Sequence, residues 1–340
     1  MLIEKQYTPE EIREKMQVIK RSDEGTEYFF EDETGSIRST VYTPFSGVSL
    51  VWKDVHMPQF ITNWRYGPVD AFSIEYCFEG RLECQVDEEC LYISKEDMII
   101  SRTDENQRIL QYPSSHYHAV SIVFRLDTPS SVLNMHLGMA GLTMEMLLQR
   151  YLPGQRYFNT LKKTDLLESL FSTIRYAPET LKTTYFGVKS LECLILLAAE
   201  VVEIEENPPK KISKHQAEMA KRVYRYVMEH PEERYSIEEL AEKFLVSPTH
   251  LKKCFQMVYG TSMQKFIREQ KMKAAAKVLE TTNLKVTETA QMFGYSNISK
   301  FAEAFKSVMG EHPKHYSMHH YAVSDEKWDS VLNTHSHKNV

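Results

Sequence analysis

The sequence contains little cysteine and no closely spaced cysteine pair. Only five Cys residues occur among its 340 residues, and no two of them form a Cys-x-x-Cys motif. They are Cys77, Cys84, Cys90, Cys193 and Cys254. A scattered, odd-numbered set of this kind argues against a disulfide framework and against a zinc site built from thiolates. It is typical of reduced thiols in the cytoplasm, where we expect this protein to act.

Long apolar runs are also absent. The best candidate, Leu194–Val202, is short and is interrupted by Glu200, whereas a membrane-spanning helix needs about 20 apolar residues. The first residues lack the basic and apolar regions of a secretory signal peptide. We therefore expect no membrane segment and no membrane partner.

Charge is distributed unevenly along the chain. The formal net charge is −6, but residues 210–317 carry 19 Lys and Arg against 12 Glu and no Asp, which leaves this segment at +7. The rest of the chain carries the opposite excess. A chain of this length predicts more than one domain, and the asymmetry suits one module that meets a polyanion and another that does not.

Short alternating runs fill the chain from about Arg38 to Leu126. Phe72, Ile74 and Tyr76 share one parity, and polar residues lie between them. Several such runs separated by polar turns predict a β-sandwich or barrel. We expect residues 1–127 to form this β domain, with a short N-terminal helix over Tyr7–Lys20.

Helical periodicity replaces the alternation over residues 128–205. The longest predicted helix, Thr184–Ile204, has one apolar face. This face consists of Leu191, Leu194, Ile195, Ala198 and Val202. It needs a partner surface, either the β domain or a second copy of the chain. Residues 206–213, which include two prolines, predict a linker, and residues 318–340 predict a flexible tail.

Beyond the linker the sequence repeats itself with a period near 50 residues. Leu251 and Phe255 recur as Phe301 and Phe305. Each copy has the signals of a helix-turn-helix unit, and the predicted helix Ser262–Thr281 joins the two copies. An ordinary helical bundle is the alternative interpretation. The outward positions of the two second helices, which can enter a major groove, are Thr249, Lys252, Lys253, Gln256, Ile298, Ser299, Lys300, Ala302 and Glu303.

The segment from about Lys214 to Tyr316 resembles the DNA-binding domain of the AraC/XylS family of transcriptional regulators. The resemblance rests on His250-Leu251-Lys252-Lys253-Cys254-Phe255, Gly260-Thr261-Ser262, Val286-Thr287-Glu288-Thr289-Ala290, Gly294-Tyr295-Ser296-Asn297, and Gly310-Glu311-His312-Pro313. It implies that both second helices lie in successive major-groove segments of double-stranded DNA, about 34 Å apart. It also leaves RNA polymerase open as a further partner.

The resemblance carries base contact over to Thr249, Lys252 and Lys253 in the first unit and to the outward positions of the second. The chain departs from the family pattern at Lys271 and Ser317, where the family usually has Arg. Glu303 also departs, because a carboxylate near phosphates is unfavourable unless it accepts from a cytosine amino group. We therefore expect the first unit to discriminate more strongly between sequences.

The layout of the front half resembles the family's cupin-like sensor barrel with dimerisation helices, which implies a homodimer and a small-molecule effector. Candidate effector contacts are Trp64, Tyr76, His116 and His118. The two histidines share the parity of Val120, so they can face the barrel interior. Rim histidines bonded to backbone or water and aromatic core packing explain the same residues, and we expect neither a metal ion nor a cofactor.

These features predict a multidomain α+β protein that regulates transcription and is not an enzyme. The alternative from another class is a cupin-type metal enzyme with an appended helical domain. It requires a complete metal triad, for which the sequence offers no clear candidate. A regulator that has lost DNA binding is a further alternative, and its helical module would lack salt-dependent affinity for any duplex.

Overall fold

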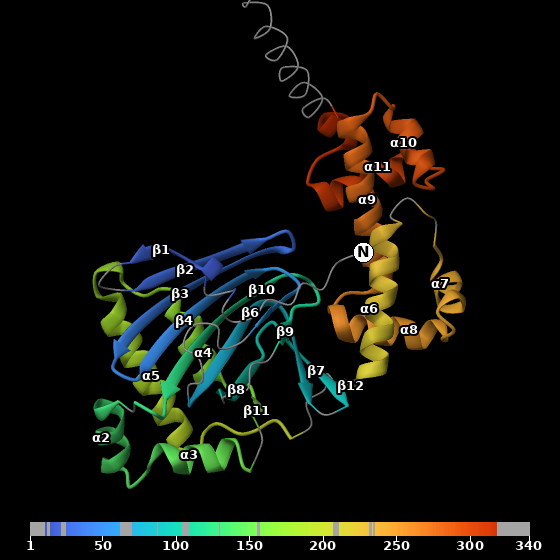
Figure 1. Ribbon diagram of the computed structural model, residues 1–340. Coiled ribbons are helices and arrows are strands. Elements are labelled where there is room, and N and C mark those ends of the chain that lie inside the picture. The colour runs from blue at the N-terminus through green and yellow to red at the C-terminus, as the bar shows by residue number, and fades with distance from the viewer. Residues whose placement is uncertain are drawn as a thin grey trace, which may run out of the picture. The chain divides into compact units, whose positions relative to one another are not determined.

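The computed structural model describes residues 11, 14–21, 25–61, 70–86, 88–103, 109–128, 130–154, 157–206, 211–230, 233 and 235–317. Within them the chain forms two compact units, Met1–Lys214 and His215–Val340, which are described separately (Figure 1). Of the described helices, none is both long enough and apolar enough to span a bilayer.

The first unit is built on antiparallel strands. Their bounds are β1 Gln17–Arg21, β2 Thr26–Asp32, β3 Gly35–Phe45, β4 Val48–His56, β5 Gln59–Ile61, β6 Ala71–Val86, β7 Glu89–Ser94, β8 Met98–Thr103, β9 Ile109–Gln111, β10 Tyr117–Arg125, β11 Phe158–Leu161 and β12 Lys211–Ser213. The long strand β6 pairs with β10 and β8 through its first half and with β7 and β9 through its second half. It therefore connects two sheets, and a buried cluster that includes Cys77, Leu82 and Tyr117 lies between them.

Helices cover the face of the larger sheet that points away from this cluster. They are α2 Ser131–Met139, α3 Met144–Tyr151, α4 Asp165–Ile174 and α5 Lys182–Ala198, with the 3-10 helix η1 Glu179–Leu181 before α5. Phe72, Ile74 and Tyr76 of β6 pack with the buried side chains of these helices. Because side chains alternate along a strand, Ser73 and Glu75 lie on the opposite face. Both faces of the central strands are thus covered.

Two expectations for this unit need correction. Glu11, Glu14 and Lys15 are helical, but Gln17–Arg21 is strand β1 rather than the end of a helix, because it pairs with β2. Of the expected linker, Lys211–Ser213 is instead strand β12, paired with β7, while 207–210 lie outside the described residues. The expected tail at 318–340 also lies outside them.

The apolar face expected on α5 is divided in the structure. Leu194 is buried against the sheet, and Val202 beyond the helix is buried as well, but Ile195 is 52% exposed. The exposed apolar residues instead follow a seven-residue spacing, Leu181, Val188 and Ile195. This spacing returns to the same side of a helix every two turns.

The second unit consists of two helix-turn-helix units joined by a long helix. Its helices are α6 Lys214–Glu229, α7 Ile237–Lys243, α8 Pro248–Tyr259, α9 Met263–Thr281, α10 Val286–Met292 and α11 Ile298–Met309. Helices α7 and α8 form the first helix-turn-helix unit, and α10 and α11 form the second helix-turn-helix unit. Helix α9 lies between them (Figure 1). The repeated Leu251, Phe255, Phe301 and Phe305 are all fully buried, as their helical spacing predicts.

The two turns have the same backbone geometry. The N–H of Val246 donates to the carbonyl of Ala241 at 2.9 Å, and 49 residues later the N–H of Tyr295 donates to Ala290 at 2.9 Å. This is the bond that closes a helix through a left-handed residue. That residue is Gly294 in the second turn (φ +86°) but Leu245 in the first (φ +56°).

Candidate functional site

Helix α8 exposes the residues predicted for the first DNA-reading surface. The Ser247 hydroxyl accepts from the backbone N–H of His250 at 3.2 Å, and Pro248 begins the helix, so the start of α8 is fixed. The buried residues are Leu251, Cys254, Phe255 and Val258. Burial of this side turns a stripe at i, i+3, i+4 and i+7 to solvent. The stripe consists of Thr249, Lys252, Lys253 and Gln256, all of them exposed.

Helix α11 repeats this arrangement with different chemistry. The side chain of Asn297 accepts from the backbone N–H of Lys300 at 3.1 Å and caps the helix. Ile298, Ser299, Lys300 and Glu303 are exposed, and Ala302 is half-buried. The surface of α11 therefore offers one cation and one anion among the predicted positions, whereas that of α8 offers two lysines.

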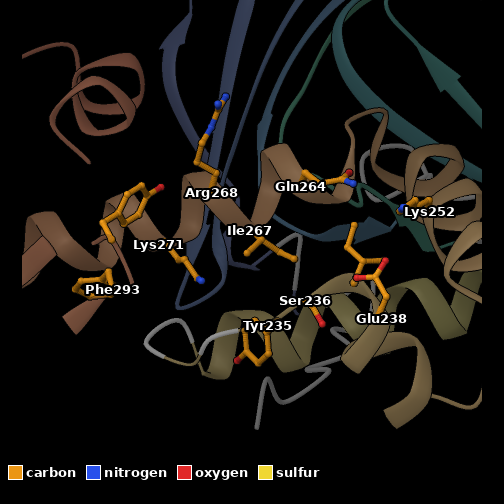
Figure 2. Close-up of a pocket in the computed structure, with 12 residues that line it drawn as sticks. Tyr235, Ser236, Glu238, Lys252, Gln264, Ile267, Arg268, Lys271 and Phe293 are labelled. Atoms are coloured by element: carbon orange, nitrogen blue, oxygen red, sulfur yellow. The ribbon is translucent and has the colours of Figure 1, made fainter. Parts of the chain in front are cut away.

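A cleft lies between the two helix-turn-helix units. It encloses about 530 Å³ and is lined by residues of α7, α8 and α9 and by the turn before α11. Figure 2 shows Gln264, Ile267, Arg268 and Lys271 along α9, with Tyr235, Ser236 and Glu238 across from them. Lys252, from the stripe of α8, also lines it. Three cations against one carboxylate make this cleft suitable for a phosphate backbone.

Sequence reasoning assigned α9 only a spacing role and missed Arg268. A signal was present, because Arg268 and Lys271 stand at i and i+3 on one side of the helix. The helical pattern did not show that this side borders the first recognition helix. Only the packing of α7 and α8 against α9 brings Arg268 and Lys271 near Lys252.

A buried carboxylate lies between the sheets of the first unit. Glu75 is 5% exposed, and its oxygens accept from the hydroxyls of Tyr117 at 2.6 Å and Ser121 at 2.5 Å and from the ammonium of Lys53. Burial raises the pKa of Glu75, but Lys53 and the two hydroxyl donors outweigh burial and leave the pKa below its ordinary value. The group is therefore an ionised, fully paired part of the interior.

A second cleft opens on the helix-covered face of the larger sheet, which is the face opposite Glu75. It encloses about 430 Å³, and Arg38, Trp52, Phe78, His118 and Arg175 are among its lining residues. Trp52 stacks on Phe78 with ring centroids 5.6 Å apart, and the guanidinium of Arg175 lies 4.3 Å from the centre of the Phe78 ring. An aromatic wall with cations beside it can accept a flat or anionic small molecule.

The residues predicted to contact an effector lie in different parts of the structure. His118 lines the second cleft, and the ring of His116 lies 4.4 Å from that of His118. Tyr76 belongs to the core instead, because it is 5% exposed and stacks on Phe171 of α4 at 5.4 Å. Trp64 lies outside the described residues.

The expected facing of the two histidines also needs correction. Side chains that share the parity of Val120 point to the helix-covered face, where Val120 packs in the core formed with α4 and α5. The interior between the sheets takes Tyr117 and Ala119 instead. Period two identifies side chains that share a face, but it does not identify which face lies inside.

The structure adds a third histidine to this pair. Side-chain ligand atoms of His56, His116 and His118, termed the histidine triad, all lie within 4.8 Å of one another. Within the described part of the chain, no other three His, Cys, Asp or Glu side chains gather closely enough to hold a metal ion. The sequence offered no clear candidate for a complete triad, and the structure supplies one. His56 was missed because 60 residues separate it from His116.

Carboxylates surround the histidine triad. Nε2 of His56 lies 2.8 Å and Nε2 of His118 lies 2.9 Å from Oδ1 of Asp54. Nε2 of His116 lies 3.4 Å from Oε2 of Glu79. Burial lowers the pKa of His118, the other two imidazoles lower it further, and Asp54 opposes them.

Comparison with known proteins concerns mainly the second unit. Residues 240–319 match a family model described as a helix-turn-helix domain. The XylDLEGF operon transcriptional activator 2 of Pseudomonas putida is 32% identical over 114 residues, which are 32% of this chain and 73% of that protein. The HTH-type transcriptional regulator AlkR of Acinetobacter baylyi is 28% identical over 26% of this chain, and the match spans only 28% of AlkR.

Among solved structures, the C-terminal domain of AraT, a response regulator from Geobacillus stearothermophilus, is 30% identical. The match covers 29% of this chain and 84% of that domain, with a TM-score of 0.28. These three matches span only the C-terminal third of the chain, which includes the second unit.

Proposed function

The chain belongs to the AraC/XylS family of transcriptional regulators, and from this premise we propose that it reads specific double-stranded DNA sites with α8 and α11. The observation that carries the proposal is the pair of capped helices whose buried residues repeat and whose predicted contact residues are exposed. Helices of this kind present their N-terminal turns to base edges in the major groove.

We propose that α8 supplies most of the sequence discrimination. Its stripe combines two lysines with Gln256, and these side chains donate to guanine edges and pair with adenine. In α11, Ile298 cannot hydrogen-bond through its side chain, and Glu303 repels phosphate unless it accepts from cytosine. Arg268 and Lys271 in the cleft between the units would neutralise phosphates and carry no sequence information.

The test compares Lys253→Ala with Lys300→Ala on a randomised DNA site library at two salt concentrations. Lys253→Ala should weaken binding by about 1–3 kcal/mol and relax the preference at one base position. Lys300→Ala should alter the preference less. Lys277→Ala, which removes the same charge from an exposed position on α9, is the matched control. If the Lys253 variant keeps the wild-type preference while the Lys300 variant loses it, the proposed ranking of the helices is wrong.

Phosphate contact by the cleft has a different signature. Arg268→Ala and Lys271→Ala should each weaken all library members alike and reduce the slope of log affinity against log salt by about one. A change of base preference without a change of slope would contradict this role.

We further propose that the first unit is a cupin-like sensor whose effector binds in the second cleft. The stacked Trp52 and Phe78 and the flanking Arg38 and Arg175 favour a small carboxylate or aromatic effector. A panel of small aromatic and aliphatic carboxylates, screened by tryptophan fluorescence, tests this assignment. A hit should lose affinity in Trp52→Ala and alter DNA affinity of the wild type. A hit unaffected by Trp52→Ala would move the effector site elsewhere.

We also propose a homodimer formed through α5. Leu181, Val188 and Ile195 leave apolar surface exposed at heptad spacing, which suits pairing with the same helix of a second copy. RNA polymerase would be a further partner if the protein activates transcription, as the P. putida relative's name states for that protein. The names of the relatives give no support to the metal-enzyme alternative.

A further inference from the structure

We propose that the histidine triad, with Asp54 as a fourth ligand, binds a divalent first-row transition metal ion of the zinc class. The triad lies on the helix-covered face of the larger sheet, at the edge of the second cleft. The site is independent of the DNA-reading surface, and its occupancy can be measured without DNA.

The donor distances fit a shared ion. Donors bonded at about 2.1 Å lie about 3.0 Å apart in octahedral and about 3.4 Å apart in tetrahedral geometry. Nε2 of His56 and of His118 already lie 2.8 and 2.9 Å from one oxygen of Asp54. The widest separation within the triad, 4.8 Å at most, must close by roughly 1 Å, which rotation of an imidazole ring can supply.

Two of the donor atoms are buried without a hydrogen bond. Oδ1 of Asp54 and Nε2 of His118 are inaccessible to solvent, and although they are close together, their geometry is not that of a hydrogen bond. Buried polar atoms without hydrogen bonds are costly, so these two atoms favour binding of a ligand that pairs with both. A cation between them would satisfy both lone pairs at once.

The strands hold the ligands in place before any ion arrives. His118 pairs in register with Asp54 on β4, and both residues therefore belong to one rigid ladder. Gly80 holds the segment before β10 close to β6, because its φ is +87° and a Cβ there would lie 1.9 Å from the carbonyl oxygen of His116. The N–H of Arg81 donates to the same carbonyl oxygen at 3.2 Å. Ligands on strands are positioned more accurately than ligands on loops.

The donor set selects the class of ion. Three imidazoles and one carboxylate favour Zn²⁺, Co²⁺, Ni²⁺ or Fe²⁺ over Mg²⁺ and Ca²⁺, which prefer ligand shells made of oxygen. Glu79 beside His116 is placed to accept from the second ring nitrogen of a bound histidine, as carboxylates commonly do around metal sites. The acidic neighbours also compensate the charge of the ion.

The experiment measures metal binding by the full-length protein. The purified chain is stripped with chelator and titrated with Co²⁺, whose visible absorption reports coordination geometry, and Zn²⁺ is then added in competition. We expect one equivalent of Co²⁺ with visible absorption bands, displaced by Zn²⁺. His56→Ala and His118→Ala should each weaken binding at least about 100-fold, because even outer-shell changes commonly cost 10–100-fold.

A matched control is needed because the sequence contains another histidine pair. His319→Ala/His320→Ala removes two adjacent histidines of the C-terminal segment and should leave the visible band and the stoichiometry unchanged. Thermal unfolding of the metal-free variants checks that they fold. The proposal is overturned if the folded wild type binds no stoichiometric Co²⁺ or Zn²⁺, or if the control abolishes binding while His56→Ala retains it.

Discussion

The backbone of the turn between α7 and α8 is strained at Leu245, and a single substitution can relieve this strain. Leu245 and Gly294 occupy equivalent positions after α7 and α10, and both have positive φ, at +56° and +86°. A left-handed conformation costs a residue with a Cβ roughly 1–2 kcal/mol, whereas glycine adopts it freely. Leu245 is 92% exposed, so removing its side chain forfeits little burial.

We predict that Leu245→Gly stabilises the helical unit by about 0.5–1 kcal/mol. The relief of strain is partly offset by the greater freedom of glycine in the unfolded chain, which costs about 0.5–1 kcal/mol. The converse change, Gly294→Ala, should destabilise the unit by about 1 kcal/mol because it places a Cβ in the left-handed conformation. For a unit of about 100 residues, 1 kcal/mol corresponds to a shift in Tm of about 4–8 °C.

Scanning calorimetry of the full-length protein measures both shifts. Phe305→Ala, which removes a fully buried ring and should cost about 3–5 kcal/mol, identifies the transition that belongs to the helical unit. Opposite shifts of this transition in the Leu245 and Gly294 variants are expected. If Leu245→Gly instead lowers the Tm of this transition, the left-handed conformation of Leu245 does not destabilise the fold and the prediction is wrong.

Three further predictions concern the first unit. The pKa of Glu75 lies below its ordinary value of 4.5, so the ionised carboxylate stabilises the fold above that value, and its contribution is lost as the pH falls through the lowered pKa. Glu75→Gln should therefore cost about 3–5 kcal/mol in urea unfolding at pH 7 and less near pH 3. An equal cost at both pH values would contradict the ion pair with Lys53. Ile195→Glu should leave the chain folded by circular dichroism and convert a dimer to a monomer by light scattering, whereas unfolding would show that Ile195 is needed inside the unit. Gly80→Ala should cost at least about 2 kcal/mol in thermal unfolding, against about 1 kcal/mol for Gly154→Ala, whose Cβ would meet nothing within 4 Å; equal costs would exclude the clash with the carbonyl of His116.

The sequence alone specified the helical unit closely, because its signals are local. The Ser236 capping box, the Ser247-Pro248 start of α8 and the glycines after α8 and α11 each act within a few residues of where they stand. Of the nine positions predicted to contact DNA, all but the half-buried Ala302 are exposed for the same reason, since helical spacing fixes which side faces the core. The base contacts themselves stay predictions.

In the β unit, local sequence signals were not sufficient to identify the interior face of the sheet. Alternation identified the side chains that share a face of β6 and β10, but helices cover one face and a second sheet covers the other. Both faces are covered and the face between the sheets carries buried polar groups such as Glu75, so polarity did not show which face is the interior. His118 was placed by parity alone, whereas Tyr76 was chosen as an aromatic side chain that could stack on an effector, and only the packing of α4 showed that Tyr76 is core.

Tertiary structure alone assembled the histidine triad and the cationic cleft. His56 ends β4 and His118 lies on β10, and hydrogen bonding between these strands brings together residues far apart in the chain. Arg268 and Lys252 likewise become neighbours of one cleft only because α8 packs against α9. The sequence determined each element through short-range capping, spacing and alternation, whereas pairing between distant strands and helices decided which side chains meet, because it depends on the free energy of the whole fold.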